Sequence, residues 1–400
     1  MTRERRSGPR VLVILDGVDE AVGWEVGPNL FPASPPDWLR VVVSARVRPD
    51  RPNAAAWASC LGWQGLARLF SLEPLLREGI KEVLENIGFP LAELSQRADI
   101  VGELHRLSEG DPLVVGLYVQ DLWQRGDEAV RLRPEDLARL EPGLEGYFDR
   151  WLEDQRRLWS AEWRQRERQL LALLRLLACA LGPLPRQDLL ELLAPDQIGG
   201  LDLDMLLGPL GRLIAGDGRR SGYVFSHPKL AAYFYDRLGA GERQRLEKRF
   251  ADWGRQCFEK LRSGELAPTE VSLYLARFLG EHLERAGAPV EQIYELLSKE
   301  WFDATTQVSD GPQLFWNEAE RVWRLALREG PSAVGQLVRA ALCFSSVASL
   351  GEKTPAGLLA LCVRHGVMSL SHAMVLVREK HEVRDRRRAL TMLAPLVAEG

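Results

Sequence analysis

The sequence predicts an α/β segment at the N-terminal end followed by a mainly helical region. Two short β-branched runs, residues 11–15 and 41–43, lack polar–apolar alternation, as expected of parallel strands buried on both faces. From Leu75 onward, apolar residues recur at three- and four-residue steps, which is the spacing of amphipathic helices. With 400 residues, 46% of them hydrophobic and 27% charged, the chain has the length and composition of two to four ordinary domains.

The first 150 residues divide after Pro74. Before it, residues 69–72 predict a third strand, residues 54–60 predict one short helix, and proline-containing loops separate the strands. After it, the helical periodicity continues to Trp123 with breaks at Gly88 and Gly110, which indicates a small helical unit. Residues 125–143 form a polar connection. We therefore expect an α/β domain over 1–74 and a helical domain over 75–150.

The middle of the chain predicts a run of helices and then a strand. Residues 169–181 are apolar almost all round, as in a buried helix. Two more helices are expected at 188–193 and 205–214, followed by a turn at 216–218, a strand at 223–225 and a helix at 229–238. This order suits a winged helix, assigned to 151–260. Helical-hairpin repeats are expected over 261–400, with helices at 274–286, 290–297, 317–328 and 356–364.

Composition and charge exclude several classes of protein. The 52 Lys and Arg residues and 56 Asp and Glu residues give a formal charge of -4, which supplies no chain-wide attraction to nucleic acid or anionic membrane. The five cysteines are scattered, which indicates neither a disulfide framework nor a zinc site. No stretch matches a secretory signal or a membrane span. We expect a cytoplasmic protein.

Residues 11–20, VLVILDGVDE, are the most informative stretch of the sequence. A buried strand ending in Asp16 would fix that carboxylate at the edge of a sheet, where it can hold Mg²⁺ through water. Asp19 and Glu20 follow within one turn, where a second acid can orient an attacking water. The alternative interpretation is a buried strand that enters an acidic turn without catalytic purpose.

These ten residues closely resemble the Walker B segment of STAND-type P-loop NTPases, a group that includes NACHT proteins. Residues 41–46, VVVSAR, resemble the sensor 1 strand; residues 108–113, SEGDPL, the G-x-P motif; and residues 225–234, FSHPKLAAYF, a winged-helix segment. The resemblance covers about residues 11–240 and is looser over the helical arm. It implies an ATPase that binds ATP or ADP with Mg²⁺ and has six site residues: Asp16 at the metal, Asp19 and Glu20 in catalysis, Arg46 at the γ-phosphate, Pro112 near adenine and His227 at the β-phosphate of ADP.

One required motif is missing. A P-loop needs G-x-x-x-x-G-K-[ST], whose backbone N–H groups and lysine hold the phosphates, and this chain has no Gly-Lys pair. The family places that strand beside the sensor 1 strand, so the edge of residues 41–44 should be unpaired. We expect the sequence to begin inside a domain. Three explanations of the missing motif are open: the natural protein is longer, another chain supplies the missing half, or the gene is a remnant.

Two functional hypotheses follow. In the first, the chain is a portion of a signalling switch in which nucleotide controls oligomerisation and activation of an effector, and by itself it hydrolyses ATP poorly or not at all. In the second, it is a non-enzymatic scaffold whose winged helix and helical arm bind protein, with a vestigial NTPase segment. DNA binding is disfavoured because residues 204–214, the expected third helix, carry one Asp and one Arg among apolar residues.

Overall fold

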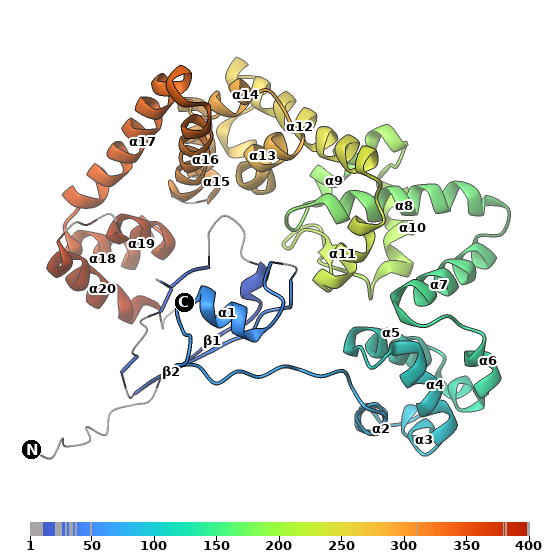
Figure 1. Ribbon diagram of the computed structural model, residues 1–400. Coiled ribbons are helices and arrows are strands. Elements are labelled where there is room, and N and C mark those ends of the chain that lie inside the picture. Colours follow the sequence, from blue (N-terminus) through green and yellow to red (C-terminus); the bar gives the residue numbers. More distant parts are fainter. Residues whose placement is uncertain are drawn as a thin grey trace, which may run out of the picture. The chain divides into compact units, whose positions relative to one another are not determined.

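The computed structural model describes residues 11–20, 26–28, 30–31, 35–36, 38–48, 50–309, 311–378, 380 and 382–397. The described chain is mostly helical, with a small parallel sheet near its beginning (Figure 1). It divides into two compact units, Met1–Ala138 and Arg139–Gly400. The fold class is thus confirmed as a small α/β element followed by a mainly helical region.

The sheet consists of β1, Val11–Leu15, and β2, Leu39–Val43, which pair in parallel with Val11 opposite Leu39 and Leu15 opposite Val43. Both strands were expected, and β2 begins two residues before the β-branched run. In the described residues β2 pairs only with β1. The strand expected at residues 69–72 is wrong, because this segment is irregular and no strand among the described residues pairs with it.

The two faces of this sheet differ in their cover. On one face, Leu15 and Val43 pack against a small core formed by Val18, Val26, Trp57 and Leu61, with Trp57 supplied by helix α1, Ala54–Cys60. On the other face, Leu12, Ile14 and Val42 are 59%, 64% and 51% exposed. The expectation of strands buried on both faces is therefore wrong, since the described residues supply a covering layer on one side only.

The rest of the first unit is a group of short helices. They are α2, Arg77–Ile87; α3, Leu91–Ser95; α4, Ala98–Ser108; α5, Pro112–Gln124; and α6, Pro134–Ala138. The predicted breaks are present: Gly110 has a φ of 73°, and a Cβ there would lie 2.5 Å from the carbonyl oxygen of Leu75. The expected polar connection over 125–143 is incorrect in part, because it contains α6 and a 3-10 helix, Gly126–Arg131.

The second unit begins with the helices α7, Gly143–Trp159; α8, Trp163–Cys179; α9, Arg186–Leu193; and α10, Gly200–Leu207. The antiparallel strands β3, Ile214–Ala215, and β4, Val224–Phe225, follow, and then α11, Pro228–Asp236. This order is the expected one with an added strand before the turn. The helix predicted at 205–214 is wrong, because Gly208 and Pro209 end α10 and Ile214 belongs to β3.

The remainder of the second unit is a helical arm (Figure 1). Its larger core, drawn from residues 251–340, contains Trp301, which has no exposed surface, and residues 356–393 form a separate smaller core. The helices expected at 274–286, 317–328 and 356–364 are confirmed within a few residues, whereas the one expected at 290–297 ends at Tyr294. The arm comprises α12, Ala240–Ser263; α13, Leu273–Arg285; α14, Val290–Tyr294; α15, Lys299–Ser309; α16, Gln313–Glu329; α17, Val334–Lys353; α18, Ala356–Arg364; α19, Leu370–Arg378; and α20, Val383–Val397.

Candidate functional site

Polar side chains meet where the two parallel strands end. Because β1 and β2 run in the same direction, Asp16 and Ser44 lie side by side at the carboxyl edge of the sheet, and the Ser44 hydroxyl donates a hydrogen bond to Asp16 Oδ1. The backbone N–H of Gly17 donates to Ser44 Oγ at 2.9 Å. Gly17 has a φ of 66°, so the chain turns sharply after Asp16. Asp16 itself is exposed.

The next two acids are held by one arginine. Asp19 and Glu20 lie in the 3-10 helix η1, Val18–Glu20. Arg46 Nε contacts Asp19 Oδ2 at 2.7 Å, and a terminal guanidinium nitrogen of Arg46 contacts Glu20 Oε1 at 3.0 Å. The backbone N–H of Arg46 also donates to Asp19 Oδ1 at 3.0 Å. Four of the predicted site residues, Asp16, Asp19, Glu20 and Arg46, are therefore brought together.

Asp19 is the electrostatic centre of this cluster. Its side chain is only 3% exposed. Burial by itself would raise the pKa of Asp19, but the hydrogen bonds from the Arg46 backbone and guanidinium, together with the charge of Arg46, outweigh burial and lower it. The carboxylate is thus ionised and already paired with a cation, so it is a weak proton acceptor in this arrangement.

A tryptophan that sequence reasoning did not single out positions Arg46. Trp57 Nε1 donates to the carbonyl oxygen of Arg46 at 3.0 Å, and the Arg51 guanidinium lies 4.5 Å above the Trp57 ring. Helix α1 is fixed at its start by Asn53, whose side chain accepts from the backbone N–H of Ala56 at 2.9 Å. The only sequence signal for this role is one aromatic residue in a short predicted helix.

The other two predicted site residues lie at helix starts. Pro112 is the first residue of α5, where Asp111 caps the helix by accepting from the backbone N–H of Leu113 at 2.9 Å. His227 caps α11, with Nδ1 accepting from the backbone N–H of Lys229 at 3.1 Å. His227 belongs to the second unit, whereas the four clustered residues and Pro112 belong to the first.

The clustered residues fit one half of a magnesium–nucleotide site. The exposed carboxylate of Asp16 and the hydroxyl of Ser44 are hard oxygen donors of the kind Mg²⁺ prefers. A cradle for the phosphates does not fit, because the chain has no Gly-Lys pair and Arg46 is engaged by Asp19 and Glu20. Within the described ranges, no group of three or more His, Cys, Asp or Glu side chains is arranged to hold a metal ion by itself.

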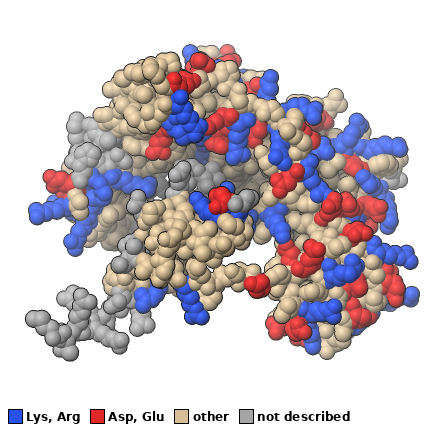
Figure 2. All heavy atoms as spheres, in the orientation of Figure 1, with Lys and Arg blue, Asp and Glu red and all other residues tan. Residues whose placement is uncertain are grey.

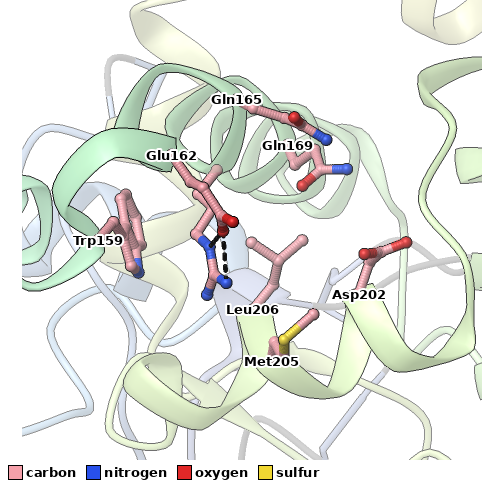
Figure 3. A pocket seen from close by; sticks show the side chains of 8 residues that line it. Trp159, Glu162, Gln165, Gln169, Asp202, Met205 and Leu206 are labelled. Carbon is pink, nitrogen blue, oxygen red and sulfur yellow. Dashed lines mark hydrogen bonds and ion pairs between the residues drawn. The ribbon is translucent and has the colours of Figure 1, made fainter.

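A shallow pocket of about 170 Å³ lies in the second unit between α8 and α10 (Figure 3). Met205 and Leu206 supply apolar surface from α10, and Glu162 and Arg166 form an ion pair at 2.8 Å on the α8 side. Beside it, Leu201 and Met205 of α10 are 82% and 51% exposed. The remaining lining residues are Trp159, Gln165, Gln169 and Asp202. The apolar composition of residues 204–214 served only to disfavour DNA binding, and this surface was not singled out from the sequence.

The charged surface is mixed. On the face shown in Figure 2, Lys and Arg side chains are interspersed with Asp and Glu side chains, without an extended area of one sign. In the described part of the chain, no helix combines the length and apolar character needed to cross a lipid bilayer. No protein-family model and no curated protein matches the sequence.

Proposed function

We propose that this chain is the acid-bearing part of a nucleotide-dependent signalling switch of the STAND type. The observation that carries the proposal is the meeting of Asp16, Asp19, Glu20 and Arg46 at the carboxyl ends of two adjacent parallel strands. Ligands of open α/β sheets bind outside this edge. The order of elements over residues 163–236, which is that of a winged helix, adds support.

Each clustered residue has a proposed role. Asp16, oriented by Ser44, holds Mg²⁺ through water, and the metal neutralises phosphate charge when it is bound. Asp19 and Glu20 orient a water near the phosphates, and Arg46 exchanges its carboxylate partners for the γ-phosphate. Pro112 and His227 contact the adenine and the β-phosphate of ADP. In the paired arrangement described above, this chain alone should hydrolyse ATP poorly or not at all.

Nucleotide would act as a state label rather than as fuel. ADP would favour a closed arrangement, and ATP would release the helical arm for protein contacts and oligomerisation. The test requires the same chain extended upstream by a phosphate-binding strand and loop. Asp19→Ala and Glu20→Ala should lower turnover by ~100-fold or more while leaving nucleotide bound, since they act on the reaction rather than on phosphate binding. His227→Ala should instead weaken retention of ADP. Unchanged turnover in both acid variants would remove the assignment.

A second candidate function is a non-enzymatic protein-binding scaffold. The exposed Leu201 and Met205 on α10 favour it, because a helix that reads a DNA groove should present Arg, Lys, Asn or Gln there. The two candidates make different predictions for the intact chain. A scaffold would bind its protein partner equally with and without nucleotide, and neither candidate predicts a salt-sensitive gel shift with duplex DNA.

A further inference from the structure

A buried chain of hydrogen bonds crosses the junction between α8 and the arm. The backbone N–H of Leu181, just after α8, donates to Tyr274 Oη at 3.1 Å. Tyr274 Oη lies 2.8 Å from His282 Nε2, and His282 Nδ1 lies 2.7 Å from Glu247 Oε2. Tyr274 and His282 belong to α13 and Glu247 to α12. Three segments separated by up to 93 residues are therefore joined by one polar chain.

Only one placement of the hydrogens satisfies every group when His282 is neutral. Tyr274 Oη accepts from Leu181, so its own hydrogen is donated to His282 Nε2. That ring nitrogen must then be the acceptor, which puts the imidazole hydrogen on Nδ1, where it is donated to Glu247. Each donor in this arrangement has one acceptor. An additional proton on the imidazole can therefore go only to Nε2, which already accepts from Tyr274.

The hydrogen-bonded series of Tyr274, His282 and Glu247 is shielded from water. The side chains of His282 and Glu247 are 2% and 4% exposed, and the ring of Phe250 stacks on the imidazole with centroids 4.3 Å apart. Burial lowers the pKa of His282 and outweighs the opposing effect of Glu247, and burial raises the pKa of Tyr274. Further charged or titratable groups around these residues are Cys179 of α8, Asp188 of α9, Glu242 and Arg243 of α12, Glu281 and Arg285 of α13, and Glu318 and Arg321 of α16. Arg321 contacts both Glu281 and Glu318.

We propose that Tyr274, His282 and Glu247 form a proton-operated latch that fastens the end of α8 to α12 and α13. A proton added at His282 Nε2 turns that nitrogen from an acceptor into a donor facing Tyr274 Oη. The Tyr274 hydrogen then has to turn away, and the structure offers it no second acceptor in the described residues. A buried hydroxyl hydrogen without an acceptor is unfavourable, and at Tyr274 Oη it competes with the Leu181 N–H, which donates to the same oxygen, so the contact with Leu181 is released.

Glu247 makes the protonated state accessible. Its second oxygen, Oε1, is buried without a hydrogen-bond partner and lies 3.8 Å from the guanidinium of Arg285. Once His282 is charged, Glu247 forms a full ion pair with it, so the added proton remains compensated inside the protein. Acid therefore loosens the junction at Leu181 and leaves the contact between α12 and α13 in place. This latch uses no residue of the nucleotide site and does not depend on the proposed function.

Hydrogen exchange at the Leu181 amide tests the latch directly in the intact chain. After correction for intrinsic exchange, the Leu181 amide should exchange at least about tenfold faster at about pH 4.5 than at pH 7.5, because burial lowers the pKa of His282 below its ordinary value and the ring takes up its proton only in acid solution. The side chain introduced by His282→Gln cannot be protonated, so exchange at Leu181 in this variant should not accelerate in acid. Tyr274→Phe removes the acceptor and should make exchange fast at both pH values.

A matched control is His365→Gln, which changes an exposed histidine at the end of α18 and should keep the full response of the original chain. Corrected exchange at Leu181 that is equal at the two pH values would overturn the latch. Exchange at Leu181 that still accelerates in acid in His282→Gln would overturn it as well.

A second measurement does not depend on the folding of any variant. Nitrogen-15 shifts of the His282 ring in the original chain should show a neutral imidazole protonated on Nδ1 at pH 7.5, which becomes doubly protonated as exchange at Leu181 accelerates. A ring already doubly protonated at pH 7.5, or one protonated only on Nε2, would contradict the proposal.

Discussion

The sheet in the first unit and the arm in the second are both rich in aliphatic residues, but they bury them to very different extents. The arm surrounds Trp301 with a continuous core drawn from α12 to α17. The sheet covers one of its faces and leaves Leu12, Ile14 and Val42 exposed on the other. An apolar run therefore shows that a segment is suited to burial, and whether it is buried depends on the layers that other elements supply.

The largest effect should come from removing the centre of the arm. Trp301→Ala takes away a side chain with no exposed surface and should lower the free energy of unfolding of the second unit by about 3–5 kcal/mol. Urea denaturation followed by circular dichroism measures this. Trp323→Ala is the matched control, since Trp323 is 37% exposed and its loss should cost less than about 1.5 kcal/mol. Equal losses in the two variants would mean that the arm has no such centre.

A slightly smaller effect is expected where α13 and α16 touch. A Cβ on Gly280 would lie 2.1 Å from Glu318 Oε2, and Glu318 is itself buried beside Arg321. Gly280→Ala should therefore destabilise the arm by about 1–3 kcal/mol in the same measurement. Gly335→Ala is the matched control and should stabilise the arm slightly. A Cβ at Gly335 meets nothing within 4 Å, and helix propensity favours alanine by roughly 0.5–1 kcal/mol. A stabilising Gly280→Ala would refute the close packing.

A buried acid gives the arm junction a pH dependence. Burial raises the pKa of Asp188 to about 6, so the folded state binds its proton more tightly than the unfolded chain does. The stability that the folded protein gains from binding this proton is therefore greatest at low pH, and it is lost as the pH rises through about 4 to 6. Asp188→Asn should stabilise the second unit by about 1–2 kcal/mol at pH 7.5 relative to its effect at about pH 4.5. Denaturation curves of both proteins at the two pH values measure the difference, and the reverse sign would contradict it.

The smallest effect belongs to the exposed face of the sheet. Ile14→Thr keeps the β-branched shape and replaces a side chain that is already in water, so the stability of the first unit should change by no more than about 0.5 kcal/mol. Trp57→Ala, on the covered face, should cost about 3 kcal/mol and release Arg46. Fluorescence-detected unfolding of the two variants would sharpen the contrast between the faces. A large loss in Ile14→Thr would mean that this face is covered in solution.

Much of the fold could be predicted from local patterns. The strands at residues 11–15 and 41–43 and the helices of the arm follow from runs and periodicities that lie within one segment. The expected strand at residues 69–72 failed because a strand depends on a partner that the sequence does not specify. The third helix of the second unit was misplaced because the apolar spacing continues through Gly208 and Pro209, although those two residues end α10.

For the candidate site, the sequence predicted which residues take part but not how they contact one another. The acids after β1 and the arginine after β2 follow from the strand ends, but the pairing of Arg46 with Asp19 and Glu20 depends on geometry across 26 or 27 residues. The Tyr274, His282 and Glu247 chain had no local signal at all, because its members are eight and 35 residues apart and each looks like an ordinary helical residue. The catalytic and nucleotide-binding roles stay predictions.

The most direct test of the account is the nucleotide content and MgATP turnover of the purified 400-residue chain. Denaturing extraction followed by chromatography measures bound nucleotide, and phosphate release measures turnover. We predict no co-purified ADP and a turnover no higher than that of the Glu20→Gln variant, because Arg46 neutralises the acids and no phosphate cradle accompanies them. Bound ADP, or a turnover that Glu20→Gln abolishes, would contradict the claim that these residues are one half of a site.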